Sequence, residues 1–169
     1  KNLTKILESD ETLLQFQSNT LLATALIDKS SPYLKSIIIN RGSKSGILKG
    51  MPVLDKEYLV GRVVETNYLS SRVLLLNDLN SRIPVTFGEE GVQAILKGSG
   101  GSRPELEYLP EGYIVEEGVE VFTSGKDRIF LPGSPIGITT EKGKVKLFSE
   151  SSQLSFVKVD LSKQKKEVF

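Results

Sequence analysis

Two stretches of the chain repeat one pattern, and this repeat decides the fold that we expect. Residues 47–54 read ILKGMPVL and residues 115–122 read VEEGVEVF, and the similar pair VGRVVE and IGITTE follows at 60–65 and 136–141. Glycine at such places allows a positive φ at a hairpin corner or a close approach of two strands. The repeat therefore indicates two similar small β-domains. A chance likeness between glycine- and valine-rich hairpins is the alternative.

The sequence around the repeat is also typical of strands. From Thr20 onward, short β-rich runs alternate with Gly, Pro, Asn and Asp, a spacing that favours antiparallel barrels or sandwiches over βαβ units. The last run, 154–161, alternates clearly, with Val157 and Val159 on one side and Lys158 on the other. We therefore expect a mainly β protein.

The repeat also suggests where the domains divide. We expect a first six-stranded, barrel-like domain over 20–88 and a second over 89–162, with the seam near the turn Gly88–Gly91. One alternative stays open, in which the last strand at 154–161 returns to the first domain. The charged residues 163–169 are expected to be a solvated tail.

The first residues have a different period. Over 1–19, leucines recur at three- and four-residue spacing without Gly or Pro, which predicts a helix and, in a heptad frame, the end of a coiled coil. Its candidate seam is Leu3, Leu7 and Leu14, with Asp10 and Gln17 as polar interruptions. A solitary amphipathic helix on the globular body is the other interpretation. Because the chain opens on a lysine and not on Met, we expect a fragment with an anchoring segment upstream.

The composition excludes several classes of function. The 169 residues are 38% hydrophobic and 25% charged, with a net charge of +1. This balance gives no reason to expect nucleic acid as a partner. The absence of His and Cys excludes Ser-His-Asp triads, Cys nucleophiles and the usual zinc sites. No run reaches the roughly 20 apolar residues of a membrane span. We expect no enzyme, no cofactor and no metal, and a module that works by presenting surfaces.

Several segments together resemble a known family. They are IIINRGSKSGILKGMPV at 37–53, LVGRVVE at 59–65, SSRVLLLND at 70–78, NSRIPV at 80–85, VFTSG at 121–125 and FLPGSPIG at 130–137. Their order and density closely resemble the periplasmic domain of the MreC family of rod shape-determining proteins. Leu131 stands where the family has Pro, and 126–128 replace the family's glycines.

The resemblance implies a bitopic protein on the periplasmic face of the bacterial inner membrane, held by a single helix that this chain lacks. It implies a coiled coil followed by two β-barrel-like domains. It also implies a non-enzymatic scaffold that maintains rod shape by organising side-wall peptidoglycan synthesis. The implied partners are the elongation-specific class B penicillin-binding protein, MreD, RodA and MreB, together with a homodimer or higher self-assembly.

Two other functions are kept as alternatives. Paired β-barrels also occur in trypsin-like proteases, so a degenerate hydrolase fold is one, although such an enzyme needs a base and the chain has no His. A peptidoglycan-binding module is the other. For the scaffold, the candidate interaction residues are Tyr58, Leu59 and Tyr68, at or beside predicted turns of the first domain. A place in the core is the alternative for each.

Overall fold

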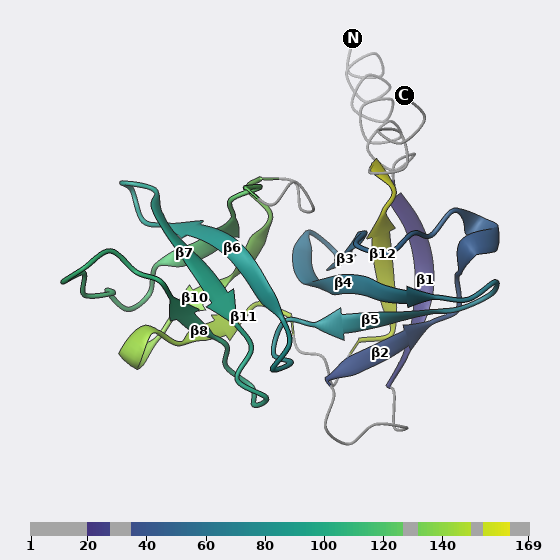
Figure 1. The fold of residues 1–169 in the computed structure, drawn as a ribbon, viewed down its shortest axis with the longest axis horizontal. Helices are drawn as coiled ribbons and strands as arrows, with labels where there is room; N and C mark the ends of the chain where they lie inside the picture. The colour runs from purple at the N-terminus through teal and green to yellow at the C-terminus, as the bar shows by residue number, and fades with distance from the viewer. Residues whose placement is uncertain (1–19, 28–34, 127–131, 150–153, 163–169) are drawn as a thin grey trace, which may run out of the picture.

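The computed structural model describes residues 20–27, 35–126, 132–149 and 154–162. The helix expected over 1–19, with its seam at Leu3, Leu7 and Leu14, and the tail at 163–169 lie outside these ranges. The described chain is mainly β, as predicted, and its strands form two six-stranded, barrel-like sheets that lie side by side (Figure 1).

The first sheet closes into a barrel with the strand order β1-β12-β3-β4-β5-β2. Its strands alternate between the core and the outer surface. On β12, Val157 and Val159 face the core and Lys158 lies between them on the outside, so the period of two predicted for this strand is confirmed. The strands are β1 (Thr20–Ile27), β2 (Ser36–Ile39), β3 (Pro52–Asp55), β4 (Tyr58–Thr66), β5 (Ser71–Leu75) and β12 (Phe156–Asp160).

The second sheet has the order β11-β10-β9-β6-β7-β8. Its end strands meet at an isolated bridge between Glu105 and Lys144, where the Val145 amide also donates to the Pro104 carbonyl at 2.8 Å. The sheet therefore curls almost into a second barrel. The elements are β6 (Arg82–Phe87), β7 (Val92–Lys97), β8 (Glu105–Glu107), β9 (Glu120–Thr123), β10 (Pro135–Thr139) and β11 (Val145–Leu147), with 3-10 turns η1 (Ser43–Ser45) and η2 (Glu141–Gly143).

The boundary between the sheets falls earlier than the sequence suggested. The expected seam, Gly88–Gly91, is the hairpin turn between β6 and β7, and β6 pairs with β9 of the second sheet through Val85 and Thr123. The chain therefore changes sheets between β5 and β6, over 76–81, and not at residue 88. The last strand, β12, inserts between β1 and β3, so it returns to the first barrel. Glycines in the sequence indicate turns, but they do not indicate which sheet the next strand joins.

The repeated sequences occupy equivalent places in the two sheets. Val53 on β3 lies opposite Gly61 on β4, and Val121 on β9 lies opposite Gly137 on β10. In both pairs the register shifts close to that glycine. The repeat in the sequence is thus a repeat in the structure.

Each of these two glycines allows a third strand to approach. A Cβ atom at Gly61 would lie 2.1 Å from the carbonyl oxygen of Leu74 on β5. A Cβ atom at Gly137 would lie 2.3 Å from the carbonyl oxygen of Lys146 on β11. Because these contacts are with backbone, a side chain at either position has to displace a strand.

We expect Gly61→Ala and Gly137→Ala each to destabilise the fold by about 1–3 kcal/mol, the range typical of overpacking. Chemical denaturation followed by circular dichroism measures this change. Gly101→Ala is the matched control, since a Cβ atom there has Ser99 Oγ at 3.6 Å as its nearest neighbour. Equal stability of Gly61→Ala and the control would contradict the close approach of β4 and β5.

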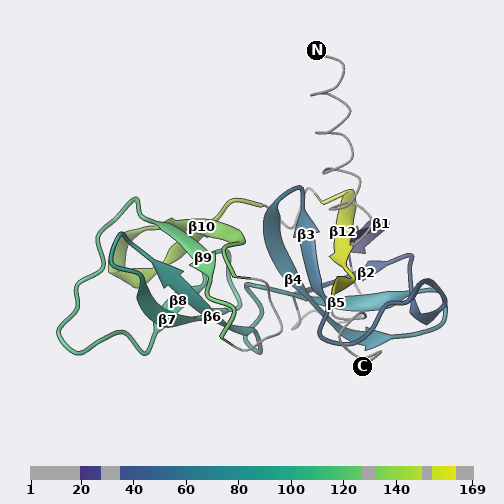
Figure 2. The same ribbon diagram turned by 90° about the horizontal axis from the view of Figure 1, so that it is seen from above.

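At the junction, side chains from the chain of the first sheet pack into the core of the second sheet. Leu59 on β4 and Leu76 after β5 belong to the core of the second sheet, although both come from the chain of the first. β4 contacts β10 there, on the side of the first barrel that faces the second sheet (Figure 2). The void left beside Leu59 and Leu76 is about 10 Å³, roughly the space of one water probe. The junction is therefore packed like a core.

The linker over 76–81 is fixed by Asp78, which is fully buried. Its Oδ2 atom accepts a hydrogen bond from the Lys35 amide at 2.7 Å, and its Oδ1 atom accepts one from the Asn80 amide at 2.8 Å. The backbone of Asp78 passes so close to Gly98 that a Cβ atom there would lie 1.8 Å from the Asp78 carbonyl oxygen. One carboxylate therefore ties the start of β2 to the passage between the sheets.

We expect Asp78→Ala to destabilise the protein more than Asp78→Asn. Alanine leaves the Lys35 and Asn80 amides without their acceptors, at about 1 kcal/mol for each lost hydrogen bond, whereas asparagine keeps one acceptor oxygen. The midpoints of denaturant unfolding test this order. A reversed order would show that the carboxylate oxygens do not hold the linker.

Candidate protein-interaction surface

Two of the three interaction residues predicted from the sequence lie at the junction between the sheets. Leu59 is 2% exposed and packs in the second core, so it offers no accessible surface. The ring of Tyr58 is half-buried and lies against that of Phe148, with 5.0 Å between their centroids. Next to it, Ser149 Oγ donates to Asp55 Oδ2 at 2.6 Å. For Leu59, the alternative reading as a core residue is the one that the structure shows.

The third residue, Tyr68, is an exposed side chain on a rigid turn. It is 64% exposed in the turn between β4 and β5, and Lys44 Nζ lies 5.9 Å from its ring centroid. The Lys44 amide donates to the Tyr68 carbonyl at 3.0 Å, and the Ser43 amide donates to the Asn67 carbonyl at 2.9 Å. The turn is thus held by η1.

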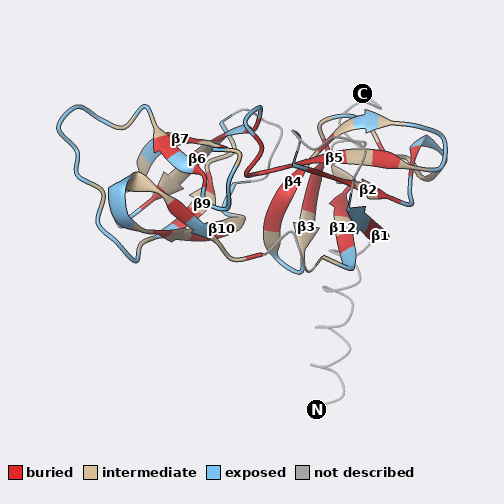
Figure 3. Ribbon diagram, turned by 90° about the horizontal axis from the view of Figure 1, so that it is seen from below, coloured by how far each residue is buried: buried red, intermediate tan, exposed pale blue. Residues whose placement is uncertain are grey.

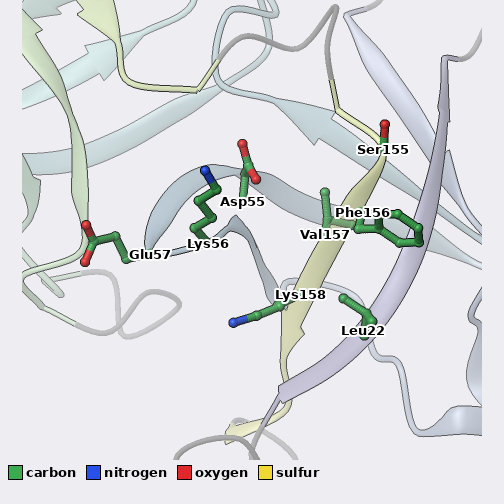
Figure 4. Close-up of a pocket in the computed structure, with 8 residues that line it drawn as sticks. All are labelled: Leu22, Asp55, Lys56, Glu57, Ser155, Phe156, Val157 and Lys158. Atoms are coloured by element: carbon green, nitrogen blue, oxygen red, sulfur yellow. The ribbon is translucent and has the colours of Figure 1, made fainter.

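A groove on the outer wall of the first barrel is a further candidate surface. Its volume is about 600 Å³. Leu22 on β1 and Phe156 on β12 form its apolar wall, and they are 55% and 61% exposed. Figure 4 shows both side chains between the two strands, with the charged residues beyond them. The lining residues are Leu22, Asp55, Lys56, Glu57, Ser155, Phe156, Val157 and Lys158.

Strand pairing explains why these two apolar side chains come together. β1 and β12 are antiparallel neighbours, with Leu22 opposite Lys158 and Thr24 opposite Phe156. Because Ala23 and Val157 face the core, the residues beside them in the chain face outward. Leu22 and Phe156 therefore lie diagonally across two neighbouring strands, within reach of one another. Exposed apolar side chains that lie together in this way form a candidate contact surface.

The charged rim gives the groove a polar edge and no evident chemistry. Lys56 and Lys158 lie on it with Glu57, while Asp55 is engaged by Ser149. Ser155 has no histidine to activate it, since the chain contains none. Among the described residues, no group of acidic side chains is placed to hold a metal ion. The arrangement suits a protein interface, with an apolar centre and a charged edge.

The alternation of β12 in the sequence contained a signal for one side of this groove. On β12, Phe156 stands in the same phase as Lys158 and Asp160, the side that alternation assigns to the exterior. A large aromatic residue in the outward phase predicts an exposed apolar contact. Its neighbour Leu22 could not be found in this way, because the pairing of β1 with β12 joins residues far apart in the chain.

In residues 20–27, 35–126, 132–149 and 154–162, no helix is both long enough and apolar enough to cross a bilayer.

Comparison with known proteins identifies the barrels. The family model described as rod shape-determining protein MreC, barrel core, matches residues 26–165. A cell shape-determining protein MreC of Caulobacter vibrioides is 36% identical over 145 residues, which cover 83% of this chain and 42% of that protein. The MreC of Cereibacter sphaeroides is 31% identical over 159 residues, covering 92% and 53%. The chain thus spans about half the length of these relatives.

Solved structures agree with this assignment. The crystal structure of MreC from Pseudomonas aeruginosa has a TM-score of 0.75 at 28% identity, and the match covers 83% of this chain and 97% of that one. A complex between penicillin-binding protein PBP2 and MreC from Helicobacter pylori contains a chain with a TM-score of 0.63 at 14% identity, covering 85% and 99%, which shows the shared fold. With the family model and both relatives in agreement, the chain belongs to the MreC family of rod shape-determining proteins.

Proposed function

We propose that this chain is a non-enzymatic periplasmic scaffold of the bacterial cell-elongation machinery. In this function it maintains rod shape by organising the enzymes that build side-wall peptidoglycan. Membership of a family whose members are named cell shape-determining proteins supports the general function. A similar solved chain is described as the major periplasmic domain of MreC, which supports the compartment.

The chemistry of the surface supports a function without catalysis. The chain has no histidine to serve as a base near neutral pH. The groove on the first barrel combines an apolar wall with lysines and a glutamate, a composition that supports a binding surface. A hydrolase function has no observation in its favour.

The proposed partner at the groove is the periplasmic part of the elongation-specific class B penicillin-binding protein. The Helicobacter pylori MreC was solved in complex with a penicillin-binding protein, and that protein shares the fold of this chain. The site is proposed from the exposed side chains of Leu22 and Phe156, an aliphatic and an aromatic residue that line one groove. The remaining proposed partners are MreD, RodA and MreB, together with further copies of this chain.

We expect Phe156→Ser to weaken binding of that penicillin-binding protein domain by at least about tenfold, and Leu22→Ser by less. The reason is that a central aromatic anchor contributes about 2 kcal/mol or more to an interface. Isothermal titration with the two purified domains from the same organism measures the change. Thermal unfolding of each variant shows whether the barrel is intact.

Two matched variants locate the contact. Ile114→Ser removes an exposed apolar side chain from the second sheet and is expected to leave binding unchanged. Tyr68→Ser removes the exposed aromatic residue predicted from the sequence. If Tyr68→Ser abolishes binding and Phe156→Ser does not, the interface lies at the turn between β4 and β5 and not in the groove. If the intact chain does not bind this partner in any direct assay, the proposed partner is wrong.

A further inference from the structure

Among the described strands, none pairs with one edge of β12 at the place where β12 begins. On this edge β3 is the neighbour, and Leu54 opposite Lys158 is the last pair toward the start of β12. If the register continued, Lys56 would stand opposite Phe156. Instead β3 ends at Asp55, and a two-residue turn, in which Lys56 has a φ of 57°, leads into β4. The sheet is therefore interrupted beside Phe156.

The backbone of Phe156 points toward this open edge. On the opposite edge, the Ala25 amide of β1 donates to the Ser155 carbonyl at 2.9 Å. Because successive residues of a strand direct their amide and carbonyl groups to opposite edges, Val157 also faces β1 and Phe156 faces away from it. Thr24, which lies opposite Phe156, likewise directs its carbonyl away from β12. The Phe156 amide and carbonyl thus point to where β3 has turned away.

The groove on the first barrel lies at this interruption. The turn with Asp55 and Lys56 forms one side of it, and β12 at Ser155 and Phe156 forms the other (Figure 4). In the described part of the chain, no backbone hydrogen bond joins Phe156 to the residues of this turn. The groove's volume of about 600 Å³ lies in the range of about 300–1,000 Å³ that is typical of ligand sites. It has room for a short extended segment.

The side chains on the outer face beside the open edge are apolar. Phe156 and Leu22 are 61% and 55% exposed and lie diagonally on neighbouring strands. A strand added next to β12 places every second side chain on this same outer face. An apolar side chain of such a strand therefore lies within reach of the Phe156 ring.

Two ammonium groups flank the open edge. Figure 4 shows Lys158 projecting from β12 toward the side of the turn, while the Glu57 carboxylate points away from β12. Asp55 is engaged by Ser149 Oγ at 2.6 Å. Within the described residues, neither Lys56 nor Lys158 forms an ion pair with a carboxylate. A carboxylate on the bound segment is the complement that these lysines lack.

We propose that an extended, acidic segment of the partner adds to β12 as a short strand. The Phe156 amide and carbonyl bond the backbone of this segment, and Leu22 and the Phe156 ring pack on an apolar side chain. The two lysines pair with its carboxylate. Residues 163–169 of the chain itself contain three lysines and one glutamate, so their charge disfavours them as the occupant. This inference rests on the proposed function and names the kind of segment that fills the groove.

Amide hydrogen exchange followed by NMR tests the open edge. In the free chain we expect the Phe156 amide to exchange at least about tenfold faster than the Val157 amide, which faces β1. A Phe156 amide as protected as that of Val157 would show that the chain itself closes the edge, and would overturn the proposal.

The same measurement with the penicillin-binding protein domain tests the added strand. At saturation we expect exchange at Phe156 to slow by at least about tenfold, because its amide then donates to the bound segment. Binding that leaves the Phe156 exchange rate unchanged overturns the strand addition alone. A chain that does not bind this domain in any direct assay overturns the proposed partner as well.

Proline substitution separates the backbone from the ring. Phe156→Pro and Phe156→Ala both remove the ring, but only proline also removes the amide donor. Because this amide faces the open edge, we expect both variants to fold. Phe156→Pro should bind the domain about fivefold more weakly than Phe156→Ala, as expected for one lost hydrogen bond. Equal binding by the two folded variants would contradict the backbone bond. If Phe156→Pro does not fold, the exchange rates of the unaltered chain decide the question.

Charge reversal tests the carboxylate of the segment. Lys56→Glu and Lys158→Glu should each weaken binding of the domain several-fold at low salt, and less at about 0.5 M NaCl, where exposed charges are screened. Lys146→Glu is the matched control, because it reverses an exposed lysine of β11 outside the groove. An equal loss in this control would show that net charge, and not the groove, causes the effect, and would overturn the acidic character of the segment.

Discussion

The close approach of neighbouring strands at two glycines is the constraint on which the rest of the structure depends. At Gly61 the carbonyl oxygen of Leu74 occupies the place of a Cβ atom, and at Gly137 that of Lys146 does the same. Each close approach brings a third strand tightly beside a hairpin, which curls a flat antiparallel meander toward a barrel. The same close approach in both sheets gives a physical reason for a glycine at both positions of the repeat.

The second determinant is that the two sheets do not have separate interiors. Leu59 projects from β4 into the core of the neighbouring sheet, and Leu76 joins it there from the linker. Asp78 then fixes the linker with both carboxylate oxygens. A shared core and a bound linker leave little room for hinge motion, since independent movement would expose apolar area.

A binding surface built on paired strands suits a scaffold, because a scaffold holds its partner at a set position. The groove formed by Leu22 and Phe156 lies on the outer wall of the first barrel. The ribbon coloured by burial shows exposed loops at both ends of the molecule and buried strands between them (Figure 3).

Much of the fold could be read from residue patterns. Alternation at Val157 and Val159 gave a strand with one buried face, and the glycine repeat gave two related β-domains. The family could be recognised from short motifs in a fixed order. Local patterns were sufficient here because side-chain alternation and turn glycines depend on neighbours in the chain.

The domain boundary and the site depended on contacts between distant residues. Nothing near Arg82 or Phe87 indicates that β6 pairs with β9, so the seam was placed at the glycine turn that follows it. Leu59 and Tyr58 follow a hairpin turn, and turns of this kind are usually exposed. In the structure, Leu59 packs in the core of the second sheet and the ring of Tyr58 packs against Phe148.

The sequence by itself therefore determined the strands, the repeat, the family and the absence of a histidine base. Only the tertiary structure decided which strand closes which barrel, and which outward-facing side chains stay exposed. The physical reason is that strand pairing and burial join residues such as Leu22 and Phe156 across more than a hundred positions, where no local pattern can register the contact.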